Sequence, residues 1–175
     1  MGLGILKYYF KSIDRPYYIR FGSGLLLLNW IVQRIFRQNA EVPYSVHFTN
    51  KITGWQYCHF EDDIALANLC VSTGAYIAAF EGTSLHVGAG TIWACNVCIQ
   101  TVNHVAGDLS KFERGSVRIG RKCWLGNGVV ITAGVTLGDN VVVGANAVVT
   151  KSFPSNVVIG GVPARILKEV GNGSL

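Results

Sequence analysis

The chain has 175 residues, of which half are hydrophobic, 14% are charged and 21 are glycine. This length favours one domain, with an appendage at most. The low charge and the many glycines favour a bent, β-rich, oligomer-forming protein over a helical one. The formal net charge of +5 lies entirely in residues 1–40, which hold six cations and one acid, so the rest of the chain is neutral.

Residues 1–40 are predicted to form a basic and aromatic helical arm. Tyr and Phe alternate with Lys and Arg at first, and an apolar run occupies residues 25–36. Because Asn29, Gln33 and Arg34 interrupt this run, it falls short of the roughly 20 apolar residues of a transmembrane helix. It also lacks the clean cleavage site of a signal peptide. Two interpretations stay open: a helix that caps one end of the repeats described below, or a helix that lies on a membrane surface.

Residues 41–66 are predicted to connect the arm to a regular region at 67–162, where apolar spacing starts at Leu69. The acidic run at 61–63 suits a solvated turn. Four apolar residues are compatible with short strands that lead into the repeats: Val42, Val46, Phe48 and Ile52.

The regular region shows a six-residue repeat. Aliphatic residues recur at Ile119, Leu125, Ile131, Leu137, Val143 and Val149. A second small or apolar residue stands two positions before each of these, and a glycine follows four of them. Two inward side chains separated by one outward side chain make a three-residue strand, and the glycine allows a turn. Three strands with their turns make one coil of about 18 residues.

A short fixed period indicates a solenoid, in which stacked coils bury a continuous ladder of aliphatic side chains. An amphipathic helix needs apolar spacings of three and four, and a sandwich needs longer turns. We therefore predict an all-β solenoid. The repeat is interrupted once, at residues 103–116, which we expect to form a polar loop that carries chemical groups.

Five cysteines, an odd number, show no paired framework: Cys58, Cys70, Cys95, Cys98 and Cys123. A lone C-x-x-C at 95–98 is weak support for a zinc site, which needs four ligands. We expect free thiols in a reducing cytosol.

The interruption and the repeats around it resemble the hexapeptide-repeat acyltransferases, and within them the sugar and polysaccharide O-acetyltransferases. The matching features are the pair Asn103–His104, the segment at 117–126, the repeats through Lys151 and the ending at 159–168. The resemblance covers roughly residues 64–170. It implies a left-handed parallel β-helix, although parallel crossovers are normally right-handed. It also implies a short C-terminal helix within residues 163–175, whose final residues 171–175 we expect to be disordered.

The resemblance implies a mechanism for the loop. His104 would be the general base that takes a proton from a sugar hydroxyl as the oxygen attacks an acetyl thioester. Asp108 or a loop carbonyl would orient the imidazole, since this chain has Val105 where many relatives have Asp. Asn103 or backbone N–H groups would stabilise the oxyanion.

Acetyl-CoA is the implied donor, and no metal is expected. The cations Lys151, Arg165 and Lys168 would hold its phosphates, unless they belong to a solvated face. The side chain of Trp124 points outward by alternation and would flank the pantetheine arm. The turns expected to offer backbone groups to that arm are Asn127–Gly128, Ala133–Gly134 and Ala145–Asn146.

One expectation follows from spacing alone. His86 lies 18 residues before His104, so an unbroken register would place the two imidazoles one rung apart, about 4.8 Å. Such a pair would favour a neutral base. A slipped register would separate them.

The resemblance implies a homotrimer with shared sites, and outward apolar residues such as Ile92 and Trp124 agree with this. We expect a sugar acceptor and no nucleic-acid partner. We expect a cytoplasmic protein whose arm could contact the inner face of the membrane. Five aromatic residues could either stack on the sugar or pack in the core. These aromatic residues are Trp55, Tyr57, Tyr76, Phe80 and Trp93. Two alternatives stay open: a noncatalytic solenoid, and a trimeric zinc enzyme like carbonic anhydrase, against which stands the lack of His at 105–116.

Overall fold

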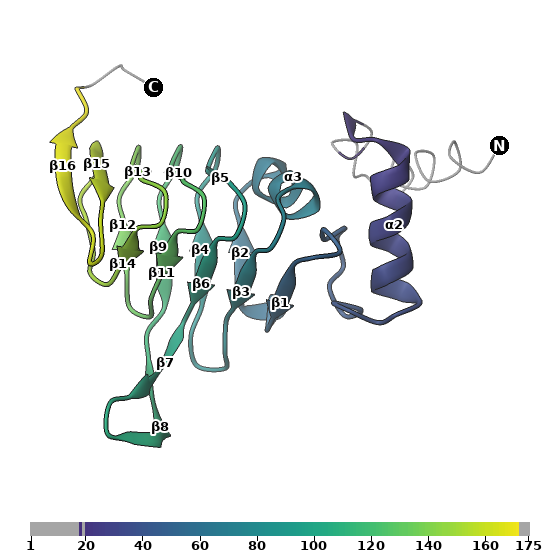
Figure 1. Cartoon of the computed structure of the whole chain (residues 1–175), viewed down its shortest axis with the longest axis horizontal. Helices are drawn as coiled ribbons and strands as arrows, with labels where there is room; N and C mark the ends of the chain where they lie inside the picture. The colour runs from purple at the N-terminus through teal and green to yellow at the C-terminus, as the bar shows by residue number, and fades with distance from the viewer. Residues whose placement is uncertain (1–17, 19, 172–175) are drawn as a thin grey trace.

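The computed structural model describes Tyr18 and residues 20–171. Its main body is a stack of coils with three flat sides, and helix α2 (Ser23–Arg34) lies at the N-terminal end of the stack (Figure 1). A hairpin of β7 (Val102–Val105) and β8 (Asp108–Arg114) projects from the side of the stack (Figure 1). Strands β15 (Val157–Gly160) and β16 (Arg165–Glu169) lie at the other end (Figure 1). The solenoid predicted from the six-residue period is therefore confirmed.

Each side of the stack is one sheet. Side A contains β1 (Lys51–Thr53), β3 (Tyr76–Ala78), β6 (Cys98–Gln100), β11 (Val130–Ile131) and β14 (Val148–Val149). Side B contains β2 (Cys58–Phe60), β4 (Leu85–Val87), β9 (Val117–Ile119) and β12 (Thr136–Leu137). Side C contains β5 (Ile92–Trp93), β10 (Trp124–Leu125), β13 (Val142–Val143), β15 (Val157–Gly160) and β16 (Arg165–Glu169). Neighbouring strands within a side are parallel except for the pair β15–β16.

The register aligns the inward residues into ladders. On side A, Ile99 pairs with Ile77 below it and Ile131 above it, and Ile131 pairs with Val149. All six predicted ladder residues from 119 to 149 are at most 1% exposed. Burial of such side chains contributes roughly 1.5–3 kcal/mol each to the stability of the stack.

Stacked turns bring backbones too close for a side chain at some glycines. A Cβ atom on Gly120 would lie 2.4 Å from the carbonyl oxygen of Gly138, one coil above. A Cβ atom on Gly138 would lie 2.4 Å from the backbone nitrogen of Ser155. Glycine is required here because only hydrogen fits between the turns.

The first coil begins earlier than expected. Strand β1 starts at Lys51 rather than at residue 67, and the coil replaces its third strand with helix α3 (Asp63–Val71). The expectation that the regular strands begin near Leu69 is therefore wrong, because Leu69 lies on α3. Asp62 explains the helix, because its carboxylate accepts from the backbone N–H groups of Ile64 and Ala65 and so caps the first turn. A short 3₁₀ helix, η2 (Trp55–Tyr57), lies between β1 and β2.

The C-terminal helix expected within 163–175 is also wrong. The chain turns back at Gly161, whose φ is +95°, and β16 pairs antiparallel with β15. The reversed strand pairs with the edge of β15 that no further coil covers. Residues 172–175 of the expected disordered tail lie outside the described residues.

Helix α2 is the described part of the predicted arm; residues 1–17 and 19 lie outside the described residues. It buries Leu26, Asn29 and Gln33 against the N-terminal end of the stack. This position agrees with the capping interpretation. None of the described helices is long and apolar enough to cross a membrane.

Candidate active site

The predicted loop at 103–116 is a β-hairpin for most of its length. Strands β7 (Val102–Val105) and β8 (Asp108–Arg114) pair antiparallel, with His104 opposite Phe112. The hairpin leaves the stack at the corner between sides A and B, where the backbone N–H of Gly115 donates to the carbonyl of Thr101 at 2.9 Å. This closed base fixes where β7, which carries His104, leaves the coils, and the hairpin can be followed in Figure 1.

The imidazole of His104 has a defined orientation. Its Nδ1 atom lies 2.8 Å from the carbonyl oxygen of Leu109, across the hairpin. A carbonyl can only accept, so Nδ1 carries a proton, and in the neutral imidazole with this tautomer the lone pair is on Nε2. The ring of Phe112 packs beside it with centroids 4.7 Å apart. His104 is exposed, and its Nε2 atom can therefore act as a base toward a bound hydroxyl.

Asp108 does not orient His104. Its Oδ1 atom accepts from the backbone N–H and the hydroxyl of Ser110, and its Oδ2 atom lies 3.0 Å from Nζ of Lys111. These contacts, those of Ser110 above all, hold the pKa of Asp108 below its ordinary value. The sequence offered either Asp108 or a loop carbonyl, and the structure places the carbonyl of Leu109 there because the register shifts between His104 and Val105.

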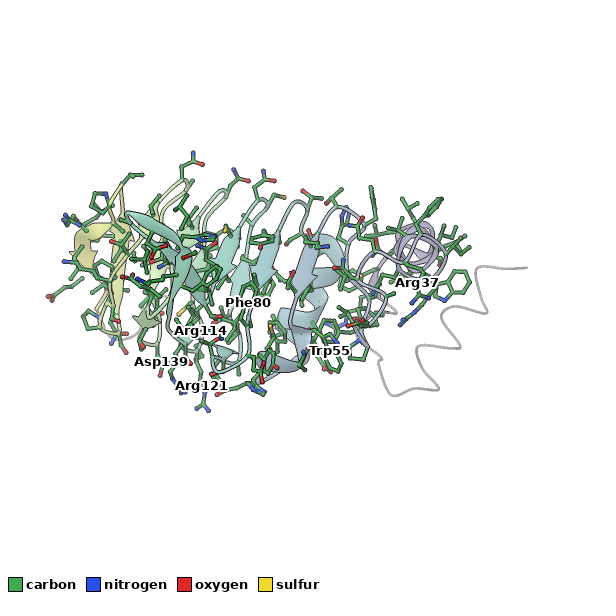
Figure 2. The ribbon with its side chains drawn as sticks, turned by 90° about the horizontal axis from the view of Figure 1, so that it is seen from below. Arg37, Trp55, Phe80, Arg114, Arg121 and Asp139 are labelled. Atoms are coloured by element: carbon green, nitrogen blue, oxygen red, sulfur yellow. The ribbon has the colours of Figure 1, made fainter. Side chains whose placement is uncertain are left out.

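Asn103 and His104 border a cavity of about 250 Å³. Its other lining residues are Tyr76, Phe80, Gln100, Val102, Phe112 and Arg114. The Oδ1 atom of Asn103 accepts from Nε2 of Gln100 at 3.0 Å, and no described residue accepts from its amide NH₂ group. Arg114 donates to the carbonyl of Glu81, which holds its guanidinium beside Phe80 (Figure 2).

Some of these residues were missed from the sequence. Phe112 and Arg114 belong to β8, and their approach to His104 depends on the hairpin register, which nothing in the local pattern revealed. Of the aromatic residues considered for sugar stacking, Tyr76 and Phe80 line the cavity. Trp93 is only 2% exposed and packs in the core. Trp55 lines a different cavity, and Tyr57 is half-buried against the core.

The predicted donor-binding residues form two groups. Ala133, Gly134 and Lys151 follow strands of side A, at the same corner as the hairpin. The backbone N–H of Gly134 donates to the carbonyl of Gly115 at 3.1 Å, which ties this corner to the base of the hairpin. His104, Ala133, Gly134 and Lys151 therefore share one edge of the stack.

The second group lies on side C and at its corner with side A. Trp124 is 40% exposed and pairs with Ile92 and Val142 in an outward row. Arg165 and Lys168 are exposed on β16 at the end of the same sheet. Ala145 and Asn146 form the turn between β13 and β14. The first group thus lies at the corner of sides A and B, the second lies on side C and at its corner with side A, and one chain does not unite them.

The expected contact between His86 and His104 is wrong. The rung neighbours of His86 are His59 and Arg118, because the hairpin displaces His104 from the coil register. Instead, His86 Nε2 lies 2.9 Å from a carboxylate oxygen of Glu61, and Arg121 Nε lies 2.9 Å from the other oxygen. These bonds, with that of Arg121 the largest cause, lower the pKa of Glu61 to about 2. Part of the predicted acidic turn is therefore a structural cluster.

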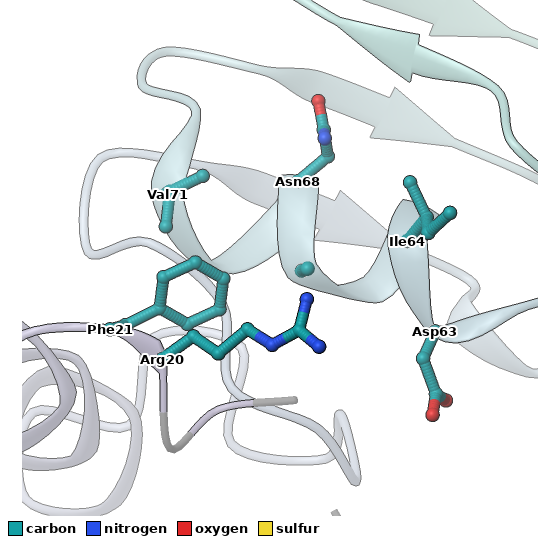
Figure 3. Close-up of a pocket in the computed structure, with 7 residues that line it drawn as sticks. Arg20, Phe21, Asp63, Ile64, Asn68 and Val71 are labelled. Atoms are coloured by element: carbon teal, nitrogen blue, oxygen red, sulfur yellow. The ribbon is translucent and has the colours of Figure 1, made fainter. Parts of the chain in front are cut away.

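All five cysteines are free thiols, as predicted. Among Tyr18 and residues 20–171, no three His, Cys, Asp or Glu side chains gather as a metal site would require. A larger cavity of about 540 Å³ lies between Arg20 and Phe21, before α2, and residues of α3 such as Asn68 (Figure 3). It shares no lining residue with the cavity around His104.

Comparison with known proteins agrees with this geometry. The bacterial transferase hexapeptide family (six repeats) matches residues 116–151. A protein of Escherichia coli (strain K12), assigned as the colanic acid biosynthesis acetyltransferase WcaF, is 53% identical over 135 residues, which cover 75% of this chain and 67% of that protein. The chain therefore belongs to the hexapeptide-repeat acyltransferase family, and the resemblance noted from its motifs is confirmed.

Two further relatives extend the comparison. WbbJ of the same organism, assigned as a lipopolysaccharide biosynthesis O-acetyl transferase, is 37% identical over 58% of each chain. The crystal structure of a maltose O-acetyltransferase from Clostridium difficile 630 matches with 30% identity and a TM-score of 0.50, covering 71% of this chain and 60% of that one. These matches span little more than half the length of the relatives. The left-handed parallel β-helix is the shared fold.

Proposed function

We propose that the protein transfers an acetyl group from acetyl-CoA to a hydroxyl of a sugar or polysaccharide precursor. The observation that carries this proposal is His104, whose Nδ1 is held by the Leu109 carbonyl at the border of a cavity with three aromatic rings. The family and the assignments of its relatives as sugar or polysaccharide O-acetyltransferases support it.

In this mechanism His104 is the general base. Its Nε2 atom takes the proton of the acceptor hydroxyl while that oxygen attacks the thioester carbonyl. The C–O bond forms, the C–S bond breaks, and the proton held on Nε2 passes to the departing thiolate. The carbonyl of Leu109 stabilises the transient imidazolium through Nδ1–H. The amide NH₂ of Asn103 is the side-chain donor closest in sequence to the base, and we assign it to the developing oxyanion.

The cavity residues fit a sugar acceptor. Tyr76, Phe80 and Phe112 supply apolar faces, while Gln100 and Arg114 supply hydrogen-bond donors. A pocket with apolar walls and a few fixed polar groups orients a small polar ligand. The identity of the sugar depends on contacts that the motifs do not define.

For the donor, Lys151, Arg165 and Lys168 would pair with the phosphates, and Trp124 would pack against the pantetheine arm. The turns at Ala133–Gly134 and Ala145–Asn146 would offer backbone groups. A chain of the same fold from Vibrio cholerae, 24% identical with a TM-score of 0.52, is complexed with acetyl-CoA. We expect the reaction in the cytoplasm, as predicted from the free thiols.

We further propose a homotrimer whose sites lie between subunits. The hairpin edge of one chain would then face side C of the next, which would bring the two groups of donor-binding residues together. The exposed side chains of Ile92 and Trp124 on side C support an interface there. A monomer in light scattering would contradict this assembly.

The proposal is tested with His104→Ala, assayed by thiol release from acetyl-CoA in the presence of a panel of sugars. Loss of a general base should lower kcat by about 10²–10⁴-fold. His59→Ala is the matched control, because His59 is an exposed histidine on the outward row of side B. Full activity of His104→Ala would refute the mechanism. Absence of thiol release with every acceptor would favour the noncatalytic solenoid.

A further inference from the structure

Helix α2 turns polar side chains toward the protein. The amide of Asn29 donates to the carbonyl of Cys70 at 3.2 Å and accepts from the backbone N–H of Phe48 at 3.0 Å. The amide of Gln33, one turn later, accepts from the backbone N–H of Val46 at 2.9 Å. Asn29 and Gln33 are buried, and they fix which side of α2 faces the stack.

The opposite side of α2 is apolar and open to solvent. Positions 27, 28, 31 and 35 follow one side of a helix, away from 29 and 33. Trp30 lies at the flank of this side, about 100° around the helix from Asn29, and Phe36 lies just after the helix. We define the α2 apolar face as the exposed apolar residues of the outer side together with these two: Leu27, Leu28, Trp30, Ile35 and Phe36. Trp30 is 42% exposed and Phe36 is 74% exposed. A helix on a soluble protein normally has the reverse polarity, so this face indicates an interaction surface.

The charge beside the α2 apolar face is positive. Arg34 and Arg37 lie at the C-terminal end of α2, where Glu41 lines a cavity with Arg37, so these three residues carry a net charge of +1. Arg20 lies before the helix and lines a cavity with Asp63. Arg34 donates to the carbonyl of Ala40 at the end of the helix, and Arg37 directly follows Phe36, at the same end of the molecule (Figure 2). Aromatic and aliphatic side chains flanked by arginine suit an anionic lipid surface, where the rings enter the interface and the cations attract the headgroups.

The arrangement allows α2 to lie flat on a bilayer. The helix runs across the end of the stack, and its outer side faces away from the coils (Figure 1). The hairpin of β7 and β8 leaves from the flank of the stack instead (Figure 1). A membrane at the α2 end would therefore leave the cavity around His104 in water.

We propose that the α2 apolar face docks on an anionic phospholipid membrane, with α2 in the plane of the interface. The positive charge beside this face favours an anionic membrane over a second copy of the chain as its binding partner. Two copies meeting through this face would bring their arginines together, which is unfavourable, whereas anionic headgroups neutralise them. The proposal does not depend on the acetyl-transfer reaction.

The test is co-sedimentation of the full chain with vesicles of phosphatidylcholine, with or without phosphatidylglycerol. The double variant Trp30→Ser/Phe36→Ser should bind the anionic vesicles about ten-fold or more weakly than the parent. Leu28→Glu, which keeps a helix-forming residue, should show the same loss. The matched control is Leu109→Ser/Leu167→Ser, which removes two apolar side chains that are 74% and 66% exposed elsewhere.

Selective binding of the parent and the control to anionic vesicles, weakened by added salt, supports the proposal. Circular dichroism should show that each variant is folded, since the substituted side chains face solvent. Equal binding to both kinds of vesicle, no binding by the parent, or undiminished binding by both α2 variants would overturn it. Dissociation of an oligomer by these variants, with no vesicle binding by the parent, would assign the face to a second copy instead.

Discussion

The proposed donor-binding residues lie in two separate groups, and this division makes a quantitative prediction about subunit mixing. If each site combines the hairpin edge of one chain with side C of its neighbour, His104 and Trp124 act from different subunits. A chain that carries His104→Ala and a chain that carries Trp124→Ala/Lys168→Ala are then each inactive alone. Together they can form an intact site at the interface where each supplies the residues that the other lacks.

The expected recovery follows from symmetry. In trimers mixed randomly from equal amounts of the two chains, about one interface in four pairs an intact hairpin edge with an intact side C. Activity should therefore return to about one quarter of the parent value. The two chains would be produced together with different affinity tags, purified through both tags and assayed by thiol release from acetyl-CoA. Purification through both tags removes homotrimers and raises the recovery to about one third.

A control uses two defects on the same edge. His104→Ala mixed with Lys151→Ala should recover nothing, because both residues belong to the hairpin edge and one chain must supply both. Recovery of activity in this control would refute the shared site. If each variant of the first mixture is inactive alone, the absence of recovery in that mixture would also refute it. If activity recovers when the two chains are synthesised together but not when they are purified separately and then mixed, the trimers do not exchange subunits.

Three further predictions concern stability. Ile131→Ala should lower the free energy of unfolding by about 2–5 kcal/mol in urea titrations, because Ile131 is fully buried between Ile99 and Val149. Val130→Ala, at its outward neighbour, is the control. A smaller loss of stability for Ile131→Ala than for Val130→Ala would contradict the assignment of Ile131 to the buried ladder. Gly120→Ala should lower the melting temperature, since its Cβ would collide with the backbone of the next coil. Glu61 has its pKa lowered from 4.5 to about 2, so its contribution to stability is present above pH 4.5 and is lost as the pH falls toward 2. Glu61→Gln should therefore flatten the pH dependence of thermal unfolding in that window, and an unchanged profile would show that the cluster contributes little.

The sequence by itself determined the solenoid and the position of the interruption that holds His104. The six-residue period is a local property, since each strand and turn needs only the residues of its own coil to reveal which side chains point inward. Ile119, Leu125 and their successors could therefore be assigned to the core. The position of His104 at the single break in this period was visible for the same reason.

Local pattern was insufficient at both ends of the solenoid. Residues 63–71 fold as α3 because the cap at Asp62 competes successfully with the apolar spacing that suggested strands. Residues 165–169 form β16 because β15 offers an unpaired edge. The cap at Asp62 is itself a local signal, which the apolar spacing concealed, whereas the choice at β16 depended on β15, a partner set by the packed coils.

Only the tertiary structure decided how the site residues are grouped and oriented. The hairpin register chose the Leu109 carbonyl over Asp108 as the partner of His104, and it brought Phe112 and Arg114 to the cavity. The same hairpin removed His104 from the rung of His86, which pairs with Glu61 instead. The corner between sides A and B joined Lys151 to the hairpin edge and left Trp124 on side C. These relations are long-range because they depend on which coil stacks on which, and a sequence period specifies the shape of each coil without specifying the partners at its corners.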